Sequence, residues 1–478
     1  MIFNSLDFAI FLPIVFILYW FATNKNLRLQ NFFVVVASYI FYGWWDWRFL
    51  SLIIFSTVVD FFVGLGLSKE DNKNKRKVLL LISILVNLSF LGIFKYYNFF
   101  LDNFITTFSF FGSEIKANSL NIILPVGISF YTFQTMSYTI DVYKRKFKST
   151  KDFIAFAAFV GFFPQLVAGP IERATNLLPQ FYAKRTFDYN KTVDGLRQIL
   201  WGLFKKIVIA DNCAKYVNLI FSYSFDYSGS TYVLGAILFA FQIYGDFSGY
   251  SDIAIGVARL FGFSIMRNFA FPYFSRDIAE FWRRWHISLS TWFRDYLYIP
   301  LGGSRGGTWM KVRNIFIIFI VSGFWHGANW TFIIWGALNA IYFLPLMLLK
   351  RNRNNLDNVA HRKYFPTIKE FFNIGVTFFL IVFAWIFFRA ENIWLAIRYI
   401  SVIFSKSILT IPESIPNATL ELVILFVIIE WIGREQQYAI AVLGMKWKRP
   451  FRWVMYQSLI ISVLFFAGNP QEFIYFQF

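Results

Sequence analysis

The sequence is poor in the residues that form metal sites and disulfides. Its 478 residues include one cysteine, Cys213, and three histidines. A lone cysteine excludes an internal disulfide and a multi-cysteine metal site, and three histidines without ligand spacing predict no metal centre. The sequence also lacks a P-loop, a GxGxxG fingerprint and a GxSxG elbow, so it does not indicate the sites that these motifs form.

Charged residues are also scarce. They make up 15% of the chain, whereas hydrophobic residues make up 57% and the mean hydropathy is +0.52. The apolar residues come in long blocks, such as 78–94, 314–349 and 371–388. Several of these blocks reach or approach the roughly 20 residues that a membrane-spanning helix needs. The sequence therefore predicts an integral membrane protein that crosses the bilayer several times.

The net charge of +19 does not indicate nucleic-acid binding. The basic residues cluster in short loops between apolar blocks, for example in 69–77 and 144–151, as the positive-inside rule predicts. No basic soluble domain is present to bind a nucleic acid. The first apolar stretch, 8–22, lacks the basic flank and cleavage site of a signal peptide, so we interpret it as the first span.

Three segments depart from a simple series of spans. Segment 152–170 contains Pro164 and has basic flanks on both sides, so we expect it to be re-entrant or to lie in the membrane plane. Segment 267–313 holds seven arginines and predicts an interfacial stretch. Block 314–349 is 36 residues long with basic residues at both ends, so it should enter the membrane and return. We predict one all-α domain, 1–478, with about ten to twelve transmembrane helices and some re-entrant or interfacial helices.

His326 is the residue most indicative of chemistry, because it lies within the uncharged block between Gly323 and Gly327. Ionisable groups at bilayer depth are costly and usually functional. Desolvation would keep this imidazole neutral, and a neutral imidazole can act as a general base. The alternative is a packing histidine bonded to a backbone carbonyl.

The other two histidines carry weaker signals. His286 lies in the interfacial stretch among tryptophans, where it either orients the site or is an ordinary interfacial histidine. His361 lies in a charged loop, and we predict no function for it.

Two carboxylates, Asp246 and Asp252, lie in the motif 244–252 between apolar segments. A buried acid needs a partner, and the nearby arginines are candidates, so we favour structural ion pairs. The arginines of 267–313 either hold a phosphate-bearing donor, since arginine suits phosphate, or mark the cytoplasmic face. These two interpretations are compatible.

Five distinct motifs are distributed over nearly the whole chain. They are LPVGISFYTFQ at 124–134, PQLVAGP at 164–170, the motif at 244–252, the Trp- and Arg-rich run at 281–303, and GFWHGANW at 323–330. The combination resembles the membrane-bound O-acyltransferase family. It is most similar to the bacterial branch that contains the alginate O-acetylation and teichoic-acid D-alanyl transfer proteins.

This resemblance implies a fold and a set of site residues. The helices would form a ring around a central tunnel or funnel that reaches the buried histidine. His326 matches the family's catalytic histidine, and His286 matches the second polar position of the site. The residues expected to bind the donor or line the tunnel are Trp282, Arg283, Arg284, Ser288, Arg294, Trp325 and Asn329.

The resemblance also implies a function. The protein would be a multi-pass enzyme of the bacterial plasma (inner) membrane, with acetyl-CoA as the cytoplasmic donor and no tightly bound cofactor. It would move an acetyl group across the membrane for O-acetylation of an extracytoplasmic polysaccharide, either alginate-like or peptidoglycan. An extracytoplasmic SGNH-type esterase or transferase would be its partner. Tyr475, in a terminal aromatic motif, is either a transient acyl carrier or an interfacial anchor.

Other functions stay open at this point. D-alanyl transfer to teichoic acid from a carrier protein is the alternative within the family, although the chain length and the Arg283–Arg284 pair look more like the acetyl branch. A transporter or flippase of a lipid-linked saccharide would also suit broken apolar blocks, but the sequence shows no paired halves. A structural scaffold for an export complex is a third class.

Overall fold

The computed structural model describes residues 1–112, 119–120, 123–222, 227–468 and 471–474. Within these ranges every regular element is a helix, which confirms the predicted all-α class. The chain divides into two compact units, one of Met1–Tyr189 with Ala258–Ile265 and one of Asn190–Val257 with Met266–Phe478. The single domain 1–478 stays a prediction.

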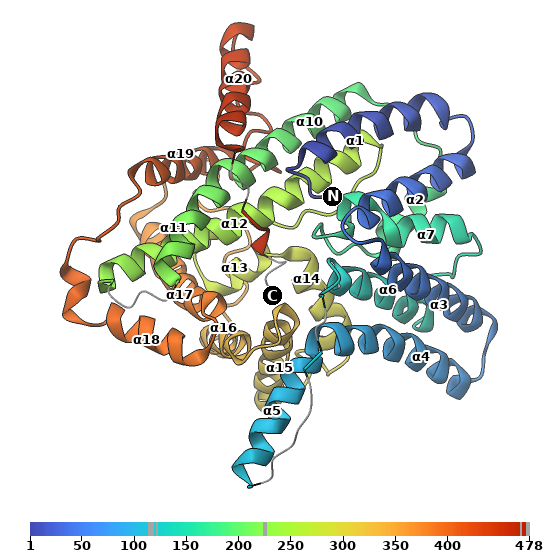
Figure 1. Ribbon diagram of the computed structural model, residues 1–478, viewed down its shortest axis with the longest axis horizontal. Helices are drawn as coiled ribbons and strands as arrows, with labels where there is room; N and C mark the ends of the chain where they lie inside the picture. The colour runs from blue at the N-terminus through green and yellow to red at the C-terminus, as the bar shows by residue number, and fades with distance from the viewer. Residues whose placement is uncertain (113–118, 121–122, 223–226, 469–470, 475–478) are drawn as a thin grey trace. The chain divides into compact units, whose positions relative to one another are not determined.

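Besides short 3₁₀- and π-helical elements, the described residues of the N-terminal unit form six α-helices of twelve or more residues and three shorter ones (Figure 1). They are α1 (Leu6–Ile17), α2 (Leu27–Gly43), α3 (Leu50–Lys69), α4 (Lys73–Leu91), α5 (Tyr97–Phe110), α6 (Ile128–Tyr143), α7 (Phe153–Gly161), α8 (Phe163–Leu166) and α9 (Ala174–Leu177).

Segment 152–170 forms the short helices α7 and α8, which are separated by Phe162. Nine and four residues are too few to cross a bilayer, which takes roughly 20. The side chains of 155–168 are all buried. Neither helix is long enough to span alone, and the re-entrant or in-plane position of the segment stays a prediction.

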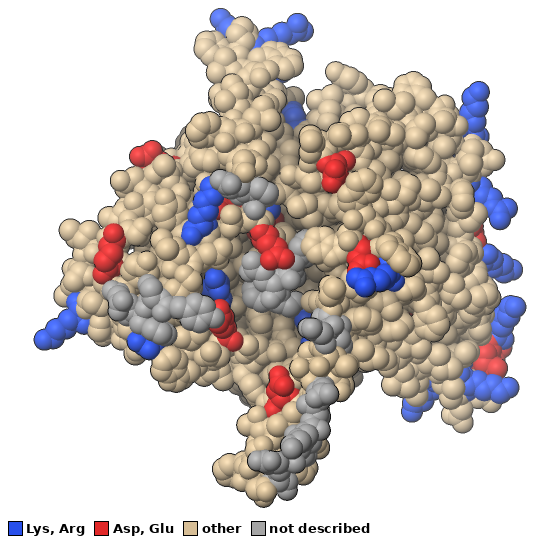
Figure 2. Space-filling view, in the orientation of Figure 1, with Lys and Arg blue, Asp and Glu red and all other residues tan. Residues whose placement is uncertain are grey.

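The surface of this unit suits lipid along the helices and water at their ends. Phe55 and Phe62 of α3 are 53% and 62% exposed, whereas charged side chains gather over the turn between α3 and α4, at the edge of the view in Figure 2. Apolar side chains that face outward are stable only against an apolar solvent. The distribution matches a helix pair whose connecting turn lies outside the hydrocarbon.

A buried polar cluster joins α3, α4 and α6 in the same unit. Asp60 of α3 accepts hydrogen bonds from Ser83 Oγ at 2.5 Å and Asn87 Nδ2 at 2.9 Å, both in α4. Ser83 Oγ also lies 2.9 Å from Thr139 Oγ1 in α6. Such hydrogen bonds hold helices together where the hydrophobic effect between them is weak.

Besides the short elements η6 (Pro272–Phe274), η7 (Arg294–Tyr298) and η8 (Lys406–Leu409), the second unit contains all or most residues of the remaining helices. They are α10 (Tyr189–Leu203), the π-helical η5 (Phe204–Ala210), α11 (Asp211–Phe221), α12 (Gly229–Leu260), α13 (Ile278–Arg284), α14 (Ile287–Phe293), α15 (Thr308–His326), α16 (Trp330–Leu348), α17 (Ile368–Arg389), α18 (Ile393–Ile403), α19 (Asn417–Gly433) and α20 (Arg449–Phe466). The interfacial stretch 267–313 contributes only short helices before α15 begins, so it is not a conventional span, as predicted.

The block 314–349 forms a hairpin of α15 and α16, which lie side by side (Figure 1). The break falls at 327–329, so the predicted turn near the middle of the block is confirmed. That the block enters the membrane and returns stays a prediction. Gly323 and Gly336 allow the two helices to touch: a Cβ at Gly323 would collide with the carbonyl oxygen of Phe332, and one at Gly336 with that of Phe319. Small residues at such positions are typical of helix contacts in membranes.

Four helical segments in the described ranges are long and apolar enough to cross a membrane by length and composition: Trp47–Lys69, Lys73–Phe110, Trp330–Leu348 and Ile368–Arg389. Leu6–Ala22 and Ile393–Ile403 are apolar but shorter. The number of ten to twelve spans, and their arrangement as a ring around a tunnel, stay predictions.

The contact at Gly336 can be tested against a glycine in open surroundings. We expect Gly336→Ala to lower the stability of the detergent-solubilised protein by more than about 2 kcal/mol, because backbone cannot move away from the new methyl group. Gly375→Ala in α17 is the matched control, since no atom lies within 4 Å of its Cβ position. Thermal unfolding measures both variants, and equal midpoints would contradict the close contact.

Candidate active site

His326 is the last residue of α15 and is 4% exposed. Aromatic rings from three helices surround it: ring centroids lie at 5.0 Å for Trp325, 5.2 Å for Trp335 in α16 and 5.3 Å for Phe388 in α17. Gly327 then continues in an extended conformation, with φ of −162°. The imidazole therefore lies in a rigid aromatic enclosure at the end of a helix.

His286 lies beside it, with 6.4 Å between the two ring centroids. It precedes α14 in a left-handed conformation, with φ of 44° and ψ of 54°, and is 1% exposed. This conformation costs a non-glycine residue roughly 1–3 kcal/mol and persists only where the surroundings hold it. Such strain is most common at functional sites.

Asn268 holds the turn at His286: its backbone bonds to Ile287, and its side chain to His286. Its carbonyl oxygen accepts from Ile287 N at 2.9 Å, and its Oδ1 lies 3.1 Å from His286 Nδ1. The same Oδ1 accepts from Ser288 N and Ser288 Oγ, at 3.2 and 2.9 Å. Asn268 is not predictable from the sequence, because a single asparagine in an irregular basic stretch carries no periodic signal.

His286 is neutral at physiological pH. Burial lowers its pKa to about 3, because a buried imidazolium loses its hydration. A neutral imidazole can accept a proton from a substrate. Trp325, predicted to line the site, contacts both histidines, with its ring centroid 6.1 Å from that of His286.

A pocket of about 600 Å³ lies between α13, α14, α15 and α16. Cationic residues line it at Arg294, Lys311, Lys350 and Arg353, and apolar residues such as Ile315 and Phe319 line the rest. Ser322 also lines it and precedes His326 by four residues on α15, which is roughly 6 Å along a helix. One part of the pocket is therefore lined by cationic residues, and another part, at Ser322, lies near the histidine pair.

Two predicted donor-binding residues, Trp282 and Arg294, line this pocket. The indole Nε1 of Trp282 has no hydrogen-bond partner among the described residues. A buried donor of this kind costs free energy unless a ligand satisfies it. The arrangement as a whole suits a ligand with an anionic end, a slender chain and a carbonyl that reaches a neutral base.

Comparison with known proteins identifies the type of reaction that this site supports. Residues 39–389 match the family model of the membrane-bound O-acyltransferases. The chain belongs to the membrane-bound O-acyltransferase family. It is therefore an O-acyltransferase, and the resemblance drawn from the sequence motifs is confirmed.

Known relatives of this acyltransferase match between about half and most of its length. It is 42% identical to a probable alginate O-acetylase of Pseudomonas putida, over 85% of this chain and 80% of that protein. It is 36% identical to a peptidoglycan O-acetyltransferase of Helicobacter pylori, over 81% of this chain and 76% of that protein. A teichoic acid D-alanyltransferase of Bacillus subtilis is 29% identical over 46% of this chain and 58% of that protein.

The other predicted donor-binding residues of the acyltransferase lie elsewhere. Arg283 donates to the carbonyl oxygens of Asn352 and Asn355, at 2.8 and 2.6 Å. Arg284 forms an ion pair with Glu280 at 2.9 Å and also bonds to the loop before α17. Neither arginine lines the pocket. Both fasten the loop between α16 and α17.

Ser288 and Asn329 are also placed by local hydrogen bonds. Ser288 bonds to Asn268 as described above. Asn329 caps α16 by accepting from Thr331 N at 3.0 Å, and its Nδ2 donates to the carbonyl oxygen of Glu391 at 2.7 Å. Their predicted part in donor binding stays a prediction.

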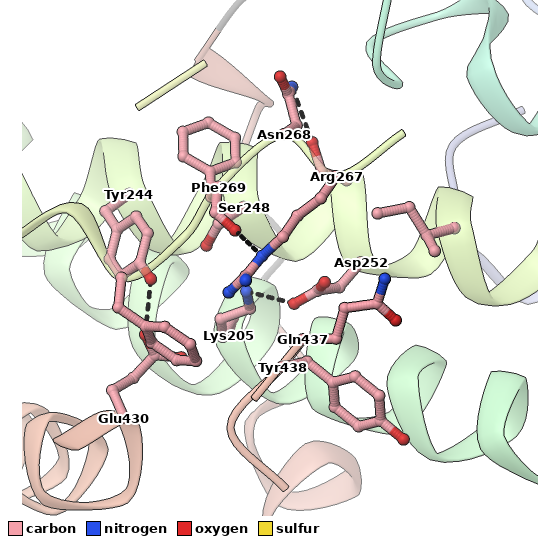
Figure 3. Close-up of a pocket in the computed structure, with 13 residues that line it drawn as sticks. Lys205, Tyr244, Ser248, Asp252, Arg267, Asn268, Phe269, Glu430, Gln437 and Tyr438 are labelled. Atoms are coloured by element: carbon pink, nitrogen blue, oxygen red, sulfur yellow. Dashed lines mark hydrogen bonds and ion pairs between the residues drawn. The ribbon is translucent and has the colours of Figure 1, made fainter. Parts of the chain in front are cut away.

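The sequence suggested that the acids of 244–252 lie between two apolar segments. The structure places both acids within the long helix α12. Both form ion pairs, and their partners are the adjacent lysines of η5 instead of arginines. Lys205 lies 2.5 Å from Asp252, and Lys206 lies 2.7 Å from Asp246. Figure 3 shows the Lys205–Asp252 pair beside the hydrogen bond between Tyr244 and Glu430, which measures 2.6 Å.

Asp246 also holds the segment that leads to the terminal aromatic motif. Its Oδ2 accepts from Ile474 N at 2.7 Å, and Phe473 packs 5.1 Å from Tyr250 between ring centroids. Tyr475 lies outside the described residues, so its role as acyl carrier or anchor stays a prediction.

Lys206 is the centre of a buried cluster, because it also lies 2.8 Å from Asp211. We expect Lys206→Met to cost about 3–5 kcal/mol, because two carboxylates are left without a counter-ion. Lys215→Met, on the exposed face of α11, is the matched control and should cost little.

A triple variant that adds Asp211→Asn and Asp246→Asn to Lys206→Met should recover most of this loss, since it removes the unpaired charges. Thermal unfolding in detergent measures the series. A Lys206→Met protein as stable as the Lys215→Met control would exclude a structural ion cluster.

Proposed function

We propose that this acyltransferase transfers the acetyl group of cytoplasmic acetyl-CoA to a hydroxyl group supplied from outside the membrane. The observation that carries the proposal is the pair of buried histidines beside a pocket with a cationic rim. The long matches to O-acetylating relatives support acetyl over other acyl groups.

The donor would lie in the pocket between α13 and α16. Arg294, Lys350 and Arg353 are exposed at its rim and suit the phosphates of the coenzyme, because cations pair with phosphate through charge-assisted hydrogen bonds. The narrow pantetheine chain would follow the apolar wall towards Ser322. Trp282 Nε1 is a suitable donor to a carbonyl oxygen of that chain.

His326 would act as the general base. It takes the proton of the attacking hydroxyl, and the hydroxyl oxygen forms a bond to the thioester carbonyl carbon. The carbon–sulfur bond then breaks, and the coenzyme thiolate leaves with the proton returned by His326. The products are an acetyl ester and free coenzyme A, so no other reactant is needed. Holding both reactants beside one base supplies orientation, and proton transfer contributes about 10²–10⁴-fold.

The polymers on the acceptor side are proposed from the names of the relatives, and the partner and the membrane from the family resemblance. The chain would act in the bacterial plasma (inner) membrane and pass the acetyl group to an extracytoplasmic SGNH-type partner, with an alginate-like polysaccharide or peptidoglycan as final acceptor. Transfer of D-alanine to teichoic acid is less well supported, because two D-alanyl relatives are only 28–29% identical and match 46% and 56% of this chain.

The role of His326 is tested by His326→Ala. We expect transfer of radiolabelled acetyl from acetyl-CoA to polymer to fall by about 10³-fold, because the base is removed. The assay uses membrane vesicles of a deletion strain complemented with each variant. His361→Ala replaces an exposed histidine and should leave transfer unchanged. Full transfer by a normally inserted His326→Ala protein would refute the proposal and favour a scaffold.

The donor pocket is tested at its rim. Replacing Lys350 and Arg353 with glutamine should raise the KM for acetyl-CoA about tenfold, which corresponds to about 1.4 kcal/mol of lost binding, while kcat changes little. Arg351→Gln is the matched control, since Arg351 is exposed in the same loop but does not line the pocket. S-acetylpantetheine lacks the nucleotide phosphates, so its KM should be the same in all three proteins. An unchanged KM for acetyl-CoA would place the donor elsewhere.

A further inference from the structure

Three groups converge on a single atom of Asn268. Its Oδ1 lies 3.2 Å from Ser288 N, 2.9 Å from Ser288 Oγ and 3.1 Å from His286 Nδ1. A backbone N–H can only donate, so the atom that it meets is the amide oxygen and not the amide nitrogen. The amide Nδ2 in turn donates to Ser251 Oγ in α12 at 3.2 Å, which agrees with this orientation.

The orientation of the amide determines the tautomer of His286. An amide oxygen carries no proton, so His286 Nδ1 must be the donor of the hydrogen bond between them. In a neutral imidazole the other nitrogen then carries the lone pair. This pattern, in which an outer partner selects the reactive nitrogen of a histidine, is common around metal-binding histidines and catalytic bases.

We infer that Asn268 is a positioning residue that keeps the proton on Nδ1 of His286 and presents the Nε2 lone pair to the acyl-transfer site. The inference rests on the proposed function. His286 would use Nε2 to accept a hydrogen bond from the attacking hydroxyl and so orient it towards the base His326, whose ring centroid lies 6.4 Å from its own. Asn268 acts through His286 and touches no substrate itself.

The surroundings of His286 favour a neutral ring. The rings that contact it from α12, from residue 269 and from α15 are uncharged: Phe247, Phe269 and Trp325. His326 is a titratable ring near it, with 6.4 Å between the ring centroids. Arg267 adjoins Asn268 in sequence, and it lines a small polar cavity together with Lys205, Asp252 and Glu430 (Figure 3).

Two substitutions of Asn268 separate positioning from packing. Asn268→Leu keeps the volume but removes the acceptor, so either tautomer of His286 can form. We expect kcat to fall at least about tenfold with KM changed little, as for other outer partners of site histidines. Asn268→Asp keeps an acceptor oxygen and should retain more activity than Asn268→Leu at high pH.

The pH profile is the readout that packing alone would not change. A carboxylate beside Nδ1–H favours the imidazolium, so in Asn268→Asp His286 takes up a proton at higher pH and loses its lone pair there. The acid side of the kcat profile should therefore move up by at least about one pH unit. The assay follows radiolabelled acetyl from acetyl-CoA into polymer in the complemented vesicles.

A parental kcat in Asn268→Leu, or a profile of Asn268→Asp that superimposes on the parent's, would overturn the inference. These outcomes are distinct from failure of the proposed function, which would appear as acetyl transfer by His326→Ala.

Discussion

The backbone contact between α15 and α16 fixes the position of His326, and the site depends on it. A side chain at Gly323 or Gly336 would collide with a carbonyl oxygen of the facing helix, so only glycine allows this approach. The chain turns directly after His326, and Asn329 caps the next helix. The imidazole is therefore held by two packed helices and by Phe388 of α17, and not by a loop.

In this unit, buried lysines and aspartates stay charged because they are paired, whereas the buried imidazole of His286 is neutral. Lys205 and Lys206 are buried together with Asp252, Asp246 and Asp211, and each charge is compensated at 2.5 to 2.8 Å. His286, by contrast, stays neutral because burial lowers its pKa. A buried charge is tolerated when it is paired, whereas an uncharged imidazole keeps a lone pair for chemistry. The ion pairs thus stabilise the fold, and in the proposed reaction the histidines act as neutral groups.

The sequence predicts those structural elements that are determined by residues close together in the chain. A 36-residue apolar block with basic ends must turn back, and glycines on both sides of His326 mark where it does. The motif 244–252 is harder to interpret, because its two acids indicate a position between apolar segments. In fact Gly245 and Gly249 let α12 approach the backbone at Lys205 and Gly202, so the helix continues.

Contacts between distant segments were not predictable in the same way. The basic residues of 267–313 indicate a side of the membrane, but not what each guanidinium touches. Arg283 and Arg284 bind the loop before α17, whereas Lys350 and Arg353 of that loop line the pocket. Asn268 and the lysine partners of the acids likewise depend on tertiary contacts that no spacing in the chain reveals.

The most direct test of the account is a structure of the protein with a non-transferable ketone analogue of acetyl-CoA. We expect the nucleotide phosphates beside Arg294, Lys311, Lys350 and Arg353, and the acetyl carbonyl between His286 and His326. A nucleotide bound away from these cations, or an acetyl group that stops short of both imidazoles, would contradict it.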